Sequence, residues 1–517
     1  MTTKTSTILN DKATAALTGI ARGIEKEGLR YTKDGLISQS PHPKSLGSTL
    51  THPYITTDYS EALLEFITPK QESIEGSLKC LSDLHAFTLA KLPDEKVWPA
   101  SMPCRINGAK SIPIAQYGSS NVGVIKNIYR RGLDVRYGRI MQAIAGIHYN
   151  VSLPKEFWLA YQEQLNDTKS ERDFRSEQYF HLIRNFHRHS WVLYYLFGAS
   201  PVLDSSFFGD RTPKLEQYGK NTWGLPYATS LRMSDLGYTN SAQQDLHIGY
   251  DSLKDYIATL SNAVQKSYPA YEKIGVKDSN GNYQQLNANI LQIENEYYSE
   301  IRPKRVADSG ERPVNALARG GVEYIEVRAL DINPFLPVGI DATESRFLDA
   351  FVLHCLLTHS AAQCPNEWAE IAENRSVIIN RGREPGLKLK YCGTQKTVVD
   401  WVDHILDGTE KCAHYLDQAH GGTQYADAVN AQRDKAKDPA NTPSGRVMAE
   451  IESGREFYDL INDLAEQHTE SLLKGGLSAE RQELFDSAAA TSVQEQADRE
   501  AADEAPFDEF LADYNQL

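Results

Sequence analysis

The sequence predicts an α+β fold with an antiparallel or mixed sheet and a largely helical C-terminal part. Short segments of strand-like alternation are spread over the first two thirds of the chain. Helical and irregular stretches separate them without a regular βαβ rhythm, which argues against a doubly wound parallel sheet. The five predicted strands are residues 23–31, 61–69, 145–154, 289–298 and 322–330.

Helical patterns account for much of the remaining chain. Apolar residues recur at helical spacing over residues 76–90, 155–200, 251–267 and 347–357, and the pattern from residue 342 to the end is mostly helical apart from a Pro/Gly-interrupted stretch at 381–393. The apolar run at 347–357 contains Asp349 and His354, so we expect a buried helix there and not a membrane span.

These patterns divide the chain into four predicted parts. They are an N-terminal extension (1–18), a carboxylate-rich sheet core with inserted helices (19–340), a mostly helical part packed on that core (341–494) and an acidic tail (495–517). The tail holds eight acidic residues and a single arginine, so we expect a solvated acidic helix or a frayed end without chemistry.

Composition excludes several classes of protein. A net charge of −15 argues against nonspecific nucleic-acid binding, which depends on clustered Lys and Arg. The N-terminus has no signal-peptide pattern, and no stretch has the length and apolarity of a membrane span. The six cysteines show no CxxC or metal-ligand spacing, so scattered reduced thiols in a cytoplasmic protein are expected.

Carboxylates recur at two-residue spacing on the predicted strands, and alternate strand residues point to the same face. The sets that share a face are Glu25 with Glu27, Glu61 with Glu65, Glu294 with Glu296 and Tyr298, His148 with Asn150, and Tyr324 with Glu326 and Arg328. A solvated sheet face would explain any one strand. Glu is nevertheless depleted in strands, and crowded carboxylates repel each other unless cations lie between them. The pattern therefore favours an Mg²⁺–nucleotide site.

Other chemistries fit the sequence poorly. It contains no P-loop, no GxGxxG after a strand, no HExxH helix and no GxSxG elbow. His187 and His189 lie in a helical pattern and point apart, which predicts structural roles. Cys104 has no base near it in sequence, so we expect a buried, inert thiol.

A basic group follows the predicted strand at 289–298. Its members are Arg302, Lys304 and Arg305. They could bind the triphosphate of a nucleotide or belong to a solvated loop, and the sequence leaves both interpretations open.

Long sequence blocks between residues 19 and 335 resemble the proteobacterial type of glutamate–cysteine ligase. They include GIARGIEKEGLR (19–30), LGSTLTHPYITTDYSEALLEFITP (46–69), YRRGLDVRYG (129–138), GIHYNVSLP (146–154), SLRMSDLGY (230–238), LQIENEYYSEIRPKR (291–305) and RGGVEYIEVRALDINPF (319–335). The resemblance implies a glutamine synthetase-like fold, in which a curved, mainly antiparallel sheet forms a funnel surrounded by helices. It also implies ATP-dependent joining of the glutamate γ-carboxylate to the cysteine amine, the first step of glutathione biosynthesis.

The resemblance also implies roles for individual residues. The implied metal ligands are Glu25, Glu27, Asp58, Glu65, His148 and Glu326. Arg328 would support phosphoryl transfer beside Glu326, and Arg232 would hold a substrate carboxylate. The cysteine carboxylate would be bound by Tyr238 and Tyr298, and the cysteine side chain would be surrounded by Tyr59, Tyr129 and Leu133. Position 59 is Phe in other members, so Tyr59 adds a hydroxyl to the pocket wall.

The implied cofactor is Mg²⁺, for which Mn²⁺ could substitute, with ATP as co-substrate. The implied partners are glutamate, cysteine and glutathione as feedback inhibitor, and the implied state is a cytoplasmic monomer. Two alternatives stay open: a ligase of the same superfamily that accepts another amine, and a non-enzymatic protein derived from a ligase. None of the matching metal carboxylates is lost, as the second alternative would predict.

Overall fold

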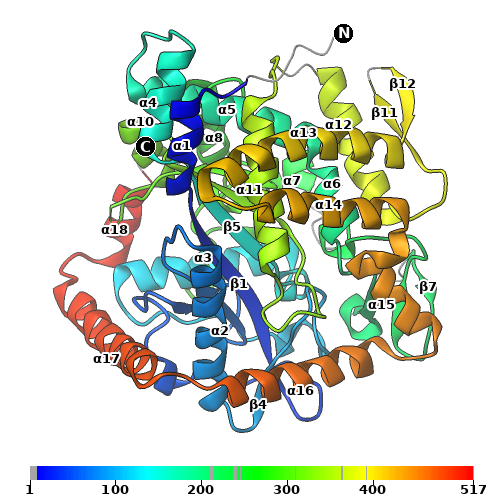
Figure 1. Cartoon of the computed structure of the whole chain (residues 1–517). Coiled ribbons are helices and arrows are strands. Elements are labelled where there is room, and N and C mark those ends of the chain that lie inside the picture. The colour runs from blue at the N-terminus through cyan, green and yellow to red at the C-terminus, as the bar shows by residue number, and fades with distance from the viewer. Residues whose placement is uncertain are drawn as a thin grey trace.

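The structure is a computed structural model that describes residues 8–209, 214–236, 241–244, 246–308, 310–362, 365–391 and 393–515. An antiparallel sheet, in which seven strands are described, forms its centre (Figure 1). The strand order is β2 (Ile55–Thr57), β3 (Leu63–Ile67), β1 (Ala21–Thr32), β5 (Ile147–Ser152), β10 (Tyr324–Leu330) and β9 (Ile301–Lys304), with β4 (Glu95–Val97) paired to β1. The predicted α+β fold with an antiparallel sheet is confirmed.

Strand register sorts the side chains of this sheet into an apolar face and a polar face. Ile24 of β1 and Val327 of β10 both lie opposite Tyr149 of β5, which gives an apolar row across three strands. One residue further along β1, Glu25 lies opposite His148. Because successive strand residues point to opposite faces, the polar residues form a second row on the other face.

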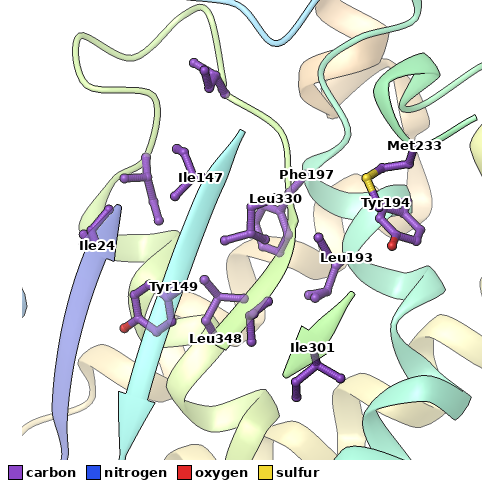
Figure 2. Packing of buried hydrophobic residues seen from close by; sticks show 14 of the residues in the cluster. Ile24, Ile147, Tyr149, Leu193, Tyr194, Phe197, Met233, Ile301, Leu330 and Leu348 are labelled. Carbon is purple, nitrogen blue, oxygen red and sulfur yellow. The ribbon is translucent and has the colours of Figure 1, made fainter. Parts of the chain in front are cut away.

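Helices α2 (Ile74–Ala90) and α11 (Ala342–Leu357) cover the apolar face. Figure 2 shows Ile24, Tyr149 and Leu348 among the packed side chains on this side. Asp349 of α11 is buried there, bound by the Arg22 guanidinium at 2.7 Å and by the Tyr149 hydroxyl at 2.9 Å. This predicted apolar helix is therefore buried, and its charge is paired inside the core.

The remaining helices surround the sheet. They are α1 (Asp11–Ala16), α3 (Asn121–Tyr137), α4 (Lys155–Gln164), α5 (Glu171–His189), α6 (Trp191–Phe197), α7 (Ser241–Gln244), α8 (Leu253–Gln265), α9 (Pro269–Ile274), α10 (Pro313–Gly320), α12 (Pro365–Arg381), α13 (Val398–His420), α14 (Gln424–Lys437), α15 (Pro443–Glu452), α16 (Phe457–Gly475), α17 (Ala479–Ala502) and α18 (Phe507–Tyr514). The predicted helical segments at 76–90, 155–200 and 251–267 are confirmed.

Two smaller sheets complete the described secondary structure. One consists of β6 (Val202–Asp204), β8 (Thr222–Gly224) and β7 (Glu216–Gln217). The other is the hairpin of β11 (Lys388–Tyr391) and β12 (Thr394–Thr397), which extends from the predicted interruption of the C-terminal helices.

The prediction of a strand at 289–298 is wrong. Residues 294–296 form a 3₁₀ turn, η7 (Glu294–Glu296), and the strand of this region is β9 at 301–304. The two glutamates that suggested a polar strand face are instead buried and bound to arginines, Glu294 to Arg312 and Glu296 to Arg136.

Glu61 also departs from its predicted place. It precedes β3, and its carboxylate accepts the backbone N–H groups of His42 and Gln116, each at 2.5 Å. Because this segment is a turn and not a strand, Glu61 does not share a face with Glu65.

The C-terminal part is mostly helical, as predicted, and of the two forms expected for its acidic end, a solvated helix or a frayed end, the structure has helices with mostly exposed residues. Helix α17 continues across the predicted boundary at residue 495, and α18 buries Leu511 against the rest of the protein. Glu500 and Asp503 accept backbone N–H groups of Ser119 and Asn121, so some of the acidic residues face the rest of the protein. The division into four parts stays a prediction.

Within the described residues, no helix combines the length and apolarity needed to cross a membrane. Cys80, Cys104, Cys355 and Cys412 are buried free thiols, and burial raises the pKa of Cys104. Cys364 and Cys392 lie outside the described residues.

Candidate active site

Five acidic residues and one histidine gather on the polar face of the sheet. Across the β1–β5 pair, His148 lies opposite Glu25, and its Nδ1 is 3.1 Å from the Glu25 carboxylate. Across the β1–β3 pair, Glu65 lies opposite Glu27. Asp58 follows β2 and lines the same pocket as Glu27. The register of two neighbouring strand pairs thus brings together residues that are far apart in sequence.

Glu326 extends the row from β10. Its register partners are Asn150 on β5 and Arg302 on β9. The Glu326 carboxylate lies 3.8 Å from His148 Nδ1 and 3.1 Å from an Arg328 guanidinium nitrogen. Burial by itself would raise the pKa of Glu326, but the surrounding cations, with Lys304 first among them, outweigh burial and hold this pKa below its usual range.

The acids on β1 and β3 crowd each other. Burial is the main cause that raises the pKa of Glu65 well above its usual value, and the charges of Glu25, Asp58 and Glu27 add to it. Burial likewise raises the pKa of Glu27. For Glu25, burial is the largest cause and raises the pKa, but the hydrogen bond and charge of His148 together with the charge of Lys304 outweigh it, so the pKa is lowered overall. Carboxylates held this close destabilise one another unless a cation lies between them.

The donor set fits a hard divalent cation. Ligand atoms of Glu25, Glu65 and His148 all lie within 4.8 Å of one another. The buried Glu326 Oε2 and Asn150 Oδ1 accept no hydrogen bond from the described residues, so they are further oxygen donors on the same face. Carboxylate oxygens with space left for phosphate are what Mg²⁺ prefers, whereas zinc sites favour Cys and His.

A pocket opens beside this acidic row. Its lining residues are Glu27, Asp58, Tyr59, Tyr129, Arg130, Leu133, Tyr137, Met141, Gln142, Ile144, His148, Arg232, Gln243, Asn295, Glu296, Tyr298, Arg302 and Arg328. The predicted metal ligands therefore lie next to the residues predicted to hold the substrates. Tyr238, predicted to bind the cysteine carboxylate, lies outside the described residues.

Arg232 is held in place by its surroundings. It lies in the 3₁₀ turn η6 (Leu231–Met233), and its guanidinium donates to the Arg328 carbonyl at 3.1 Å. Asp331 lies 3.8 Å from the same guanidinium, and Asp331 is itself fixed by hydrogen bonds from the Ser200 and Ser230 hydroxyls. Gly146 leaves the space that the guanidinium fills, because a Cβ there would lie 2.1 Å from Arg232 Nη2.

The predicted basic group divides in two. Arg302 and Lys304 alternate on β9, so both point toward the acidic row; Lys304 Nζ is 3.6 Å from Glu326. Arg305 follows the strand, and its guanidinium donates to the carbonyls of Gly320 and Gly321 at the end of α10. The solvated-loop interpretation is wrong for Arg302, which is buried, and Arg305 does not join the site.

The pocket also contains residues that sequence reasoning missed. Arg130 donates to the Asp58 carbonyl, and its guanidinium lies 4.5 Å from the centre of the Tyr117 ring. It stands beside Tyr129 in the YRRGLDVRYG block, so its position next to a predicted pocket residue was the available signal. Met141, Gln142 and Ile144 precede β5 and carried no such signal.

The other residues singled out in the sequence have structural surroundings. His187 packs against Tyr250 and Trp368, whereas His189 stacks on His354. The two histidines thus point to different neighbours, as predicted, and neither reaches the pocket.

Comparison with known proteins identifies the family. The profile described as glutamate-cysteine ligase matches residues 6–378. The glutamate–cysteine ligase of Hahella chejuensis is 50% identical over 504 residues, which cover 96% of each chain. That of Alcanivorax borkumensis is 49% identical over 512 residues, or 98% of each chain.

Solved structures agree with this assignment. The crystal structure of a glutamate–cysteine ligase from Francisella tularensis in complex with AMP superposes with a TM-score of 0.90 at 37% identity, covering 96% of this chain and 97% of that one. A bifunctional glutathione synthetase from Pasteurella multocida has a TM-score of 0.74 at 25% identity over 93% of this chain and 57% of its own. With half of its residues shared along nearly its whole length, the chain belongs to the glutamate–cysteine ligase family.

Proposed function

We propose that this enzyme joins the γ-carboxylate of glutamate to the amine of cysteine, with conversion of ATP to ADP and phosphate, as the first step of glutathione biosynthesis. The observation that carries the proposal is the acidic row of β1, β3, β5 and β10 beside a pocket lined by Arg232, Arg328 and Tyr298. The names of the relatives and the AMP bound to the Francisella tularensis protein support it.

ATP is needed because a carboxylate oxygen is a poor leaving group. Transfer of the γ-phosphoryl group to glutamate gives γ-glutamyl phosphate, from which the amine displaces phosphate. Such transfer requires charge neutralisation and in-line placement more than acid–base catalysis. Mg²⁺ held by Glu25, Glu27, Asp58, Glu65, His148 and Glu326 would supply that neutralisation of phosphate charge.

Three arginines and one lysine are placed to contact the reacting groups. Arg328 lies on the strand of Glu326 and lines the pocket, so its guanidinium is placed to stabilise charge on the transferred phosphoryl group. Arg302 and Lys304 lie on the neighbouring strand and are placed for phosphate oxygens of the nucleotide. Arg232 is placed for a substrate carboxylate, since its position is fixed by Asp331 and Gly146.

A second candidate is a ligase of the same superfamily that accepts another amine. The surroundings of Tyr59 are the observation that favours this second candidate. Its side chain is 1% exposed, it lines the pocket, and its hydroxyl has no hydrogen-bond partner among the described residues. Such a hydroxyl can contact a thiol, but it can equally favour a different small side chain.

Phosphate release separates the candidates. We expect release to require both glutamate and an amine, with cysteine preferred over 2-aminobutyrate, alanine and ammonia. Equal rates of phosphate release with cysteine and alanine would favour the second candidate. Phosphate release that requires neither glutamate nor an amine would contradict ligase activity.

The metal and catalytic assignments have their own tests. We expect EDTA to abolish turnover and Mg²⁺ or Mn²⁺ to restore it. We also expect Glu326→Gln and Arg328→Ala to abolish turnover with the fold kept, as checked by circular dichroism. Wild-type turnover in either variant at saturating ATP and Mg²⁺ would contradict the assignment.

The family resemblance further supports a cytoplasmic monomer inhibited by glutathione. Gel filtration would test the monomeric state, and titration with glutathione would test the inhibition.

A further inference from the structure

The last helix packs on the outer side of the pocket wall. Leu511 of α18 is 5% exposed and forms a small apolar cluster, separate from the main core, with Ile125 and Ile128 of α3 and with Leu286. Phe507, Phe510 and Tyr514 of α18 pack against this cluster. The acidic end of the chain is thus anchored by an apolar face, although its charge suggested a solvated helix or a frayed end.

The same cluster reaches the pocket through Tyr129. Tyr129 packs against the cluster and also lines the pocket. Leu133 and Tyr137 follow it at intervals of four residues on α3 and line the pocket as well, since residues four apart share a helix face. Any shift of α3 toward or away from α18 therefore moves the pocket wall.

Polar contacts hold the start of α3 to the end of α17 and to the residues that follow it. Glu500 accepts the Ser119 N–H at 2.8 Å, and Asp503 accepts the Asn121 N–H. The Asn121 amide donates to the Ala505 carbonyl at 3.0 Å. Carboxylates are favourable at this end of a helix, because the first N–H groups lack helical partners and carry partial positive charge.

The segment that precedes the pocket residues Asn295 and Glu296 is tied to the same elements. Leu286 belongs to the cluster, and Ile293 packs against it. Between them, the Gln292 amide donates to the Tyr129 carbonyl at 3.2 Å and accepts the Leu286 N–H at 3.0 Å. Asp508 of α18 accepts the Tyr283 hydroxyl at 2.6 Å. The C-terminal residues thus contact both α3 and the segment that holds Tyr283 and Leu286.

We propose that residues 500–514, which we call the C-terminal strap, set the affinity and selectivity for the amine substrate by fixing the position of Tyr129. The inference rests on the proposed function, which assigns Tyr129 to the amine pocket. The metal-binding face is formed by the central sheet, whereas the strap packs on α3 and on residues 277–286. Arg130 of α3 also donates to the Asp58 carbonyl, so the effect extends to the edge of the metal-binding face but is expected to be largest for the amine.

The test is Leu511→Ala, which removes the buried anchor and leaves every pocket residue unchanged. We expect KM for cysteine to rise about tenfold, because a small displacement of a positioning group is enough for an effect of this size. We expect KM for glutamate and ATP to stay within about twofold, and the preference for cysteine over 2-aminobutyrate to fall. Unchanged KM for cysteine would overturn the proposal.

Leu460→Ala is the matched control. Leu460 lies on α16, is 1% exposed and belongs to the main core, so the same truncation lowers stability at least as much without touching the strap. We expect its KM for cysteine to match wild type. An equal rise in both variants would mean that general loosening, and not the strap, is responsible.

A second variant covers the case in which Leu511→Ala does not fold. The double substitution Glu500→Gln and Asp503→Asn weakens the contacts with the start of α3, together with the Gln496–Glu500 contact inside α17, and we expect KM for cysteine to rise about threefold. An unchanged value would again overturn the proposal. These outcomes differ from failure of the proposed function, in which the wild-type enzyme itself would release no phosphate with glutamate and cysteine.

Discussion

Two regions of this protein carry glutamates at the same two-residue spacing and use them in opposite ways. Glu25 and Glu27 on β1 face Glu65 and His148, so acidic groups meet one another. Glu294 and Glu296 in η7 are each bound to an arginine; Glu296 lies 3.0 Å from Arg136, and Glu294 lies 3.0 Å from Arg312.

The contrast shows what decides the role of a buried carboxylate. In the first region several carboxylates lie close together, and the charges of Glu25, Asp58 and Glu27 add to the raised pKa of Glu65, so the site gains from a bound cation. In the second region a guanidinium neutralises each acid, and hydrogen bonds from the Tyr137 hydroxyl and the Gln292 N–H complete the surroundings of Glu296. The first pair is therefore suited to bind metal, and the second holds the pocket wall together.

The largest expected effect comes from Glu65→Gln in the acidic row. We expect turnover to fall roughly 10³-fold, or about 4 kcal/mol, because a metal ligand is lost. The metal-free protein should melt at the same temperature or slightly higher, since the amide removes repulsion from Glu25, Asp58 and Glu27. A melting temperature lowered by several degrees would show that the Glu65 carboxylate is structural, and the contrast with Glu296 would then be wrong.

For Glu296→Gln we expect the main effect to be a loss of stability, whereas for Glu65→Gln it is a loss of turnover. It leaves the buried Arg136 guanidinium without its counter-charge, and we expect about 3 kcal/mol less stability in urea titration. Glu311→Gln is the matched control, because Glu311 pairs with Arg319 at the surface and such pairs contribute little. Equal midpoints for the two variants would contradict the structural role of Glu296.

Gly146→Ala tests whether the substrate pocket can be altered without moving the acidic row, because Gly146 contacts both Arg232 and Glu27. The new Cβ would displace the Arg232 guanidinium, while the Gly146 N–H could still donate to Glu27. We expect KM for glutamate to rise about tenfold, with KM for ATP changed much less. Gly475→Ala, where a Cβ meets open space, is the control. A rise in KM for ATP of equal size would show that the acidic row had moved too.

The smallest effect is expected for Tyr59→Phe. Removing the hydroxyl that has no partner among the described residues should lower kcat/KM for cysteine about threefold and raise it for 2-aminobutyrate. The ratio of the two values is the measurement. An increase for both amines would mean that the hydroxyl only hinders binding.

The sequence pattern was sufficient to predict features that depend on residues a few positions apart, such as which side chains share a strand face. Alternation placed Glu25, Glu27, His148 and Glu326 on strands, and family blocks pointed to Tyr129 and Arg232. The same alternation failed at 289–298, because spacing does not reveal that an arginine from elsewhere in the chain, Arg136 or Arg312, pairs with each acid. Arg305 was misplaced for a related reason: where β9 ends decides which basic residues face the site.

By itself, the sequence determined the α+β class, most of the helices, and which carboxylates alternate on strands, since these depend on neighbours a few residues apart. The tertiary structure alone decided which acids meet each other and which meet arginines, because register and helix packing join residues more than one hundred positions apart. It also decided that an acidic tail docks on the pocket wall, since one apolar face on α18 outweighs its exposed charge.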